Sequence, residues 1–164
     1  MMLVDVIVVL IFVVITVVES VRGFGRALFD TIALIVVLKA CKLLSPSLAS
    51  SVIFYGSPTA NAGFSFLLLF VVMGVVGLIL AKLLYEALLW TLDAFDTFVG
   101  GLIGLIASGV VASALMHGLY LWGGGFTQHV APFGIAMQRS WAGQEFLEWR
   151  TYNAILGFLR SLGK

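Results

Sequence analysis

The side chains in this sequence that could do chemistry are few, and they are scattered among long apolar stretches. Asp93 and Asp96 are three residues apart and could act as a carboxylate pair in acid–base catalysis or metal binding. An Asp directly ahead of an apolar helix, however, usually accepts hydrogen bonds from the free backbone N–H groups of that helix and faces the positive end of its dipole. We therefore expect Asp96 to cap the helix that follows it.

A second group of charged residues follows the first apolar stretch. Arg22 and Arg26 are four residues apart, with Glu19 three residues before the first and Asp30 four residues after the second. On a helix this spacing forms a ladder of ion pairs, which we expect to anchor the first helical connection at lipid phosphates. Paired arginines also suit anionic headgroups and carboxylates, so a substrate-binding role for Arg22 and Arg26 stays open.

Among the titratable residues inside the apolar segments, Lys39, Lys42 and His117 stand out. Titratable groups within a membrane are functional candidates by default, so these three residues define a candidate path for protons or solutes. The sequence has no Ser-His-Asp order with a glycine elbow, no HExxH, no phosphate loop and no dinucleotide fingerprint. Its single cysteine, Cys41, excludes a disulfide within the chain. We expect no catalytic residue, no metal site and no cofactor.

The composition places the chain in a membrane. Of its 164 residues, 62% are hydrophobic and 10% are charged, whereas soluble domains average about half apolar and a quarter charged. Because so few polar side chains cannot cover a water-facing surface, the apolar excess must face the lipid bilayer or partner helices. Nine Lys and Arg against eight Asp and Glu leave a net charge of +1, without the broad basic field that attracts nucleic acid.

Four apolar segments approach the roughly 20 residues that a helix needs to cross the hydrocarbon layer. They cover about residues 3–18, 27–44, 64–84 and 98–122. Charges and two glycines in residues 19–26 indicate a turn, and uncharged turn formers in residues 45–63 predict a loop. From Gln144 to Leu162, apolar residues at three-and-four spacing alternate with charges, which predicts an amphipathic helix on the membrane or against the bundle.

The predicted fold is therefore all-α: an integral membrane bundle of about four transmembrane helices plus a C-terminal amphipathic helix. Residues 1–122 form the transmembrane domain in this interpretation. Residues 123–164 form a Gly-rich loop and the amphipathic helix.

Small residues recur every four positions in the fourth segment, at Gly100, Gly104, Ser108 and Ala112. This spacing makes a smooth ridge along a helix, which lets another backbone approach closely. We expect the ridge to pack inside the bundle, with self-association of two copies or a substrate path as alternatives. A row of small residues on the third segment offers a partner face: Gly74, Gly77 and Ala81.

Several of these residues form a recognisable set: Asp5, the run Arg22-Gly23-Phe24-Gly25-Arg26, and Asp96 followed at four-residue steps by Gly100 and Gly104. In this set the sequence resembles the bacterial CvpA family, the colicin V production proteins, over about residues 3–122. The chain departs from the family pattern at three positions. Ala27 stands where an acidic residue is common, and Thr97 and Ala107 stand where Arg is common.

The resemblance implies a four-helix protein of the bacterial inner membrane that is connected with bacteriocin export and envelope stability. Related domains precede serine proteases of the secreted side, which implies that both termini lie outside the cytoplasm and that Arg22 and Arg26 lie inside. We expect a non-enzymatic protein that acts through helix packing with itself, as a homo-oligomer, or with other membrane proteins. A small channel or carrier, or a structural subunit of a larger complex, are the alternatives.

Overall fold

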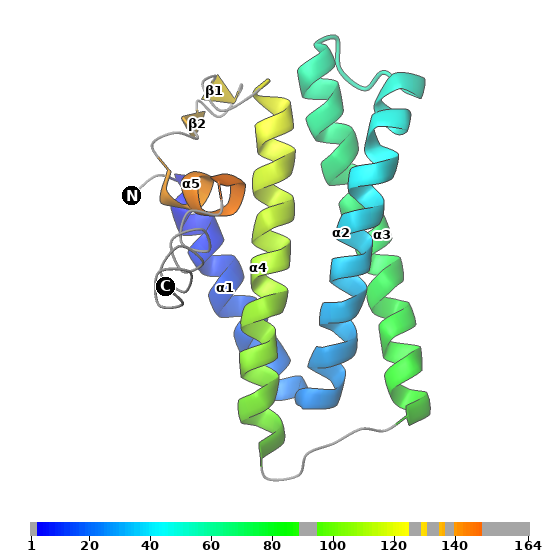
Figure 1. Ribbon diagram of the computed structural model, residues 1–164, viewed down its shortest axis with the longest axis vertical. Helices are drawn as coiled ribbons and strands as arrows, with labels where there is room; N and C mark the ends of the chain where they lie inside the picture. Colours follow the sequence, from blue (N-terminus) through cyan, green and yellow to red (C-terminus); the bar gives the residue numbers. More distant parts are fainter. Residues whose placement is uncertain (1–2, 89–94, 125–128, 131–134, 137–139, 149–164) are drawn as a thin grey trace, which may run out of the picture.

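The computed structural model describes residues 3–88, 95–124, 129–130, 135–136 and 140–148. Within these residues the chain forms four long helices and a short fifth one. They are α1 (Leu3–Arg22), α2 (Phe24–Ser51), α3 (Pro58–Leu88), α4 (Asp96–Trp122) and α5 (Trp141–Glu148). Between α4 and α5, β1 (His129–Val130) pairs antiparallel with β2 (Ile135–Ala136). The long helices run side by side as a bundle, and α5 lies beside the N-terminal end of α1 (Figure 1).

The predicted all-α membrane bundle is confirmed. Three helices, α1, α3 and α4, are long and apolar enough to cross a membrane, judged by length and composition. The fourth long helix, α2, is not one of these three, although its 28 residues extend about 42 Å at roughly 1.5 Å per residue. It lies against α3 and α4 within the bundle, and it carries the charges that the sequence places in the second segment (Figure 1).

A single residue, Gly23, joins α1 to α2. Its φ of +83° lies in the left-handed region, which glycine adopts without the steric cost that a side chain brings. The turn predicted over residues 19–26 is therefore tighter than expected, because helix continues up to Arg22 and begins again at Phe24. The chain reverses at Gly23, and α2 runs back along α3 and α4 with few contacts to α1 (Figure 1).

The loop predicted over residues 45–63 is mostly helical, so that prediction was wrong at both ends. Helix α2 continues through Pro46 to Ser51, and α3 begins at Pro58, which leaves only residues 52–57 between them. Pro58 takes the first helical position, where its missing N–H removes no helical hydrogen bond. Turn-forming residues thus start and finish the two helices here without separating them by a long loop.

The buried side chain of Asn61 stabilises the connection between α2 and α3 through four hydrogen bonds. Its Oδ1 accepts hydrogen bonds from the backbone N–H groups of Phe54, at 2.7 Å, and Tyr55, at 3.2 Å. Its Nδ2 donates to the carbonyl oxygens of Ala49, at 2.7 Å, and Val52, at 3.0 Å. Because the last carbonyls of a helix have no partner within it, one amide satisfies backbone groups that would otherwise stay unpaired.

Helix α4 is central, since it contacts α1, α2, α3 and α5. It divides the apolar core into two clusters. One cluster joins α1, α4 and α5 and includes Val4, Val8, Ala112, Met116, Leu119 and Ala142. The other joins α2, α3 and α4 and includes Val37, Cys41, Phe66 and Ala114. The outward faces of α1 and α3 expose rows of valine and leucine, as helices in contact with lipid do.

The amphipathic helix predicted from Gln144 to Leu162 begins earlier, at Trp141, and its described part ends at Glu148. Residues 149–162 of that prediction lie outside the described residues, as does Asp93. Helix α5 packs against α1 and α4, which agrees with the predicted placement against the bundle. The ring of Phe146 lies 6.0 Å from the ring of Phe12 on α1, measured between centroids.

Candidate functional site

The charges at the α1–α2 turn form one cluster, the charged node: Glu19, Arg22, Arg26 and Asp30. The Nη1 atom of Arg22 lies 3.1 Å from Oε1 of Glu19, and Nε of Arg26 lies 3.0 Å from Oδ2 of Asp30. The predicted ladder is therefore confirmed. The structure adds a pair that helical spacing does not predict, because Nη1 of Arg22 also reaches across the turn to Oδ2 of Asp30 at 2.9 Å.

The two acids of the node are buried more deeply than the two bases. Asp30 is fully buried and Glu19 nearly so, whereas the Arg22 side chain is 44% exposed. Arg26 also donates from Nη2 to the carbonyl oxygen of Leu78 on α3 at 3.4 Å, which links a third helix to the node. Because an unpaired buried charge is costly, these pairs make the burial of two carboxylates tolerable. Both guanidinium groups are used in internal contacts, which favours a structural role.

Asp96 connects α4 to the same turn. Its Oδ1 accepts a hydrogen bond of 3.0 Å from the backbone N–H of Phe24, the first residue of α2. The predicted cap on its own helix was wrong, because Phe95 is the N-cap of α4 and Asp96 already lies in the first turn. A Cβ atom on Gly23 would overlap the Asp96 carboxylate, so glycine is needed there for space as well as for its φ angle.

The glycines of α4 bring this helix against α1. A Cβ atom on Gly100 would lie 2.8 Å from the carbonyl oxygen of Glu19, and one on Gly104 would lie 2.9 Å from the Cβ atom of Glu19. Ser108 and Ala112 follow on α4 and are both fully buried. The ridge is thus used inside the bundle, as we expected for its main role.

The partner face predicted for this ridge was wrong. Its neighbour is α1, not the small residues of α3. A Cβ atom on Gly74 would meet nothing within 4 Å, one on Gly77 would approach Val37 of α2, and Ala81 lines a groove between α2 and α3. Sequence spacing identifies a surface for close approach, but it does not say which helix approaches.

Asp5, the remaining residue of the family pattern, lies at the opposite end of α1 from the charged node. Its Oδ1 accepts a hydrogen bond from the Ser140 hydroxyl at 2.7 Å and one from the backbone N–H of Ala142 at 3.1 Å. The Ser140 hydroxyl also accepts from the N–H of Gly143 at 3.1 Å. Asp5 therefore holds the start of α5 on α1. We did not single out Ser140, although a Ser directly before a helix is a start signal that could have identified it.

Lys39, Lys42 and His117 meet at a second site, which we call the cationic cavity. It has a volume of about 520 Å³ and lies between α2, α4 and α5. Ser113 adds a hydroxyl to its lining, and the other lining residues are Ile35, Leu38, Ile106, Gly109, Val110 and Phe146. The ring of His117 is held edge-on to Phe66 of α3, with 4.9 Å between centroids. The three titratable residues that the sequence singled out thus share one cavity.

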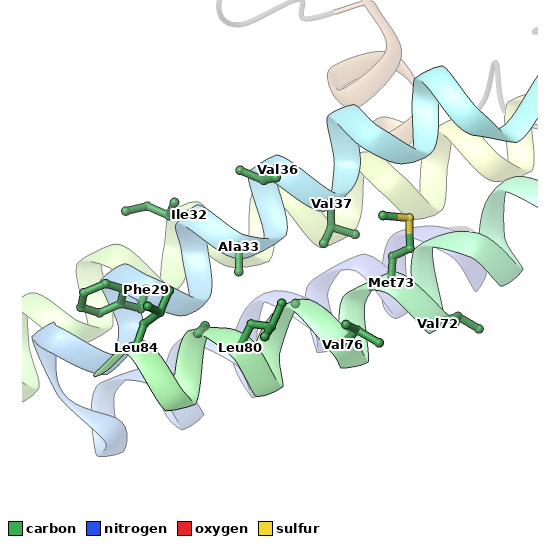
Figure 2. A pocket seen from close by; sticks show the side chains of 12 residues that line it. Phe29, Ile32, Ala33, Val36, Val37, Val72, Met73, Val76, Leu80 and Leu84 are labelled. Carbon is green, nitrogen blue, oxygen red and sulfur yellow. The ribbon is translucent and has the colours of Figure 1, made fainter. Parts of the chain in front are cut away.

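A third hollow is an apolar groove of about 420 Å³ between α2 and α3. Figure 2 shows side chains of both helices along it, including Ile32 and Val36 from α2 and Val76 and Leu80 from α3. Its lining residues carry no charge, so the groove suits apolar chains rather than polar ligands. Among the residues that the structure describes, no group of three or more His, Cys, Asp or Glu could hold a metal ion.

Comparison with known proteins connects these features to one family. The family model described as Colicin V production protein matches residues 4–148. This match reaches beyond the residues 3–122 that carry the sequence resemblance and includes α5, which Asp5 holds in place. Comparisons with curated proteins and with solved structures give no match.

A matched pair of glycine substitutions tests the approach of α4 to α1. Gly100→Ala should lower the thermal unfolding temperature of the purified chain in mild detergent, because its Cβ would press on backbone atoms of Glu19 and Gly23. Gly74→Ala should leave that temperature unchanged, because its Cβ meets nothing within 4 Å. Equal unfolding temperatures for the two variants would contradict the packing described above.

A second pair of substitutions tests the charged node. Asp30→Ala leaves Arg26 without its buried partner and should cost about 3–5 kcal/mol in free energy of unfolding, measured by denaturant titration in mixed micelles. Glu86→Ala breaks the exposed pair with Lys82, at 3.6 Å, and should cost at most about 1 kcal/mol. Replacing Arg26 by Met in the Asp30→Ala background should recover part of the loss. A small effect of Asp30→Ala alone would contradict the structural role of the node.

Proposed function

The chain belongs to the colicin V production protein family, and we propose that it is a non-enzymatic membrane protein that supports production or export of a bacteriocin toxin. The observation that carries this proposal is the family match over residues 4–148. We further propose that the chain contributes to envelope homeostasis and acts through helix packing, with itself or with another protein of the inner membrane.

The distribution of polar groups supports a role without catalysis. The acids and arginines of the charged node pair with one another, while Asp5 and Asp96 accept hydrogen bonds from the starts of two other helices. These side chains thus stabilise the bundle, and the outward faces of α1 and α3 are apolar. Because the α4 ridge already packs on α1, we assign association with a partner to these outward faces rather than to the ridge.

A small channel or carrier is the second candidate, and the cationic cavity favours it. Lys39, Lys42 and His117 come from two helices and line one hollow, as residues of a solute site would. Solute flux into liposomes that disappears in His117→Ala would support this candidate over the first. The two proposals therefore differ in whether the purified chain acts alone.

Toxin release provides the functional test. The full chain should restore release of a colicin-V-type toxin in a producing strain that lacks its own member of the family, measured as killing of sensitive cells by culture supernatant. The Gly74→Ala variant should restore release equally well, whereas Gly100→Leu should not, because a larger side chain cannot fit against Glu19.

The native complex provides the matching physical readout. After gentle solubilisation from the same strain, the chain should migrate at a mass above that of one 17.6 kDa copy in its micelle. A folded, membrane-inserted chain that fails to restore release would refute the link to toxin production. A chain that restores release as a solitary copy would refute action through helix packing.

A further inference from the structure

We propose that the cationic cavity binds an amphiphilic anion, with a phosphate-type headgroup on Lys39 and Lys42 and an apolar tail against the hydrophobic lining. This proposal does not depend on the role in toxin production. It rests on the charge, the shape and the construction of the cavity.

The positive charge of the cavity favours an anionic ligand. Lys39 and Lys42 are three residues apart on one face of α2, and both residues line the cavity. In the part of the chain that the structure describes, the basic residues with ion pairs are Arg22, Arg26 and Lys82, and neither lysine of the cavity has an acidic partner. Both lysines are exposed at the surface of the bundle, so an anionic headgroup can reach both of them from outside.

The opposite wall offers hydrogen bonds. Ser113 and His117 are four residues apart on α4, so both side chains face the cavity from consecutive turns. A hydroxyl and an imidazole can each donate a hydrogen bond to a phosphate oxygen. The contact of His117 with Phe66 fixes the plane of the imidazole ring. Two helices thus contribute four polar side chains to the lining of one cavity.

The size of the cavity and its apolar lining favour a ligand with a hydrocarbon tail. A volume of about 520 Å³ falls within the roughly 300–1,000 Å³ of small-molecule sites and far exceeds the space that a bare phosphate fills. The rest of the lining is apolar and includes Ile35, Ile106 and Val110. An anion with a hydrocarbon chain satisfies both parts of the cavity, whereas a free ion leaves the apolar part empty.

Helix α5 completes the wall. Phe146 of α5 lines the cavity and also packs on Phe12 of α1. Since Asp5 holds the start of α5 through Ser140 and Ala142, the position of this wall depends on a contact outside the cavity. Figure 1 shows α5 against α4 near the N-terminal end of α1.

Lipid retention by the purified full chain tests the proposal. Native mass spectrometry from mild detergent should show phosphatidylglycerol bound in preference to phosphatidylcholine. Lys39→Gln with Lys42→Gln should weaken phosphatidylglycerol binding about tenfold or more, because two charge-assisted contacts are lost. Lys82→Gln removes a cation at a distance from the cavity and should leave binding unchanged. Equal retention of the two lipids, or a preference that survives the double substitution, would overturn the proposal.

A second variant separates the cavity from general attraction between charges. Val110→Trp fills the apolar part while both lysines stay, so phosphatidylglycerol binding should fall although the net charge is unchanged. Binding that is unaffected by Val110→Trp would place the lipid outside the cavity and overturn the proposal. Inorganic phosphate added to lipid-free protein should not raise its unfolding temperature. Protection by phosphate alone, lost in the lysine double variant, would assign the site to a free anion and overturn the amphiphilic occupant.

Discussion

The whole structure depends on how a membrane protein satisfies buried polar groups where no water can reach them. A buried N–H or carboxylate without a partner costs free energy, so most such groups find a partner within the chain. The α1–α2 turn concentrates this problem, because a one-residue connection places two helix ends and four charges in one small volume. The charged node and the Asp96 carboxylate solve most of it: each buried acid pairs with arginine through one of its two oxygens, and the start of α2 receives its acceptor from α4. Among the described residues, Oε2 of Glu19 and Oδ1 of Asp30 have no hydrogen bond.

These contacts at the α1–α2 turn determine how the helices of the bundle pack. Asp96 reaches Phe24 because Gly23 has no side chain, and α4 lies close to α1 because Gly100 and Gly104 have none. Three glycines from two distant parts of the sequence therefore serve one junction. At the other end of the bundle the polar groups are arranged differently. Asp5 holds α5, and the lysines of the cationic cavity lack acidic partners in the described part of the chain. At the α1–α2 turn the acids and arginines pair with one another, whereas the two lysines of the cationic cavity are available to a ligand.

Local features of this fold could be predicted from the sequence, and long-range ones could not. The Glu19–Arg22 and Arg26–Asp30 pairs follow from helical spacing, which acts within one or two turns. The contact of Asp96 with Phe24 joins residues 72 positions apart, and no local rule specifies it.

The glycine ridge on α4 could be identified from the sequence, but its partner helix α1 could not, since every apolar helix offers a similar surface. The predicted loop over residues 45–63 was too long, because turn formers such as Pro46 and Pro58 also occur within helices and at their starts. The cavity shows the same division: its three titratable residues were grouped correctly, but Ser113 and Phe146 required the structure.

The central claim, that the start of α4 is fixed against the end of α1, can be tested by one disulfide. A Cβ atom placed on Gly101 would lie 3.5 Å from the Cβ atom of Ser20, which suits a disulfide, whose Cβ atoms are about 3.5–4.5 Å apart. In a Cys41→Ser background, Ser20→Cys with Gly101→Cys should oxidise readily in native membranes, seen as a mobility shift that reductant reverses. Ser20→Cys with Gly74→Cys should not form this bond. Failure of the first pair to cross-link in a folded chain would contradict the account.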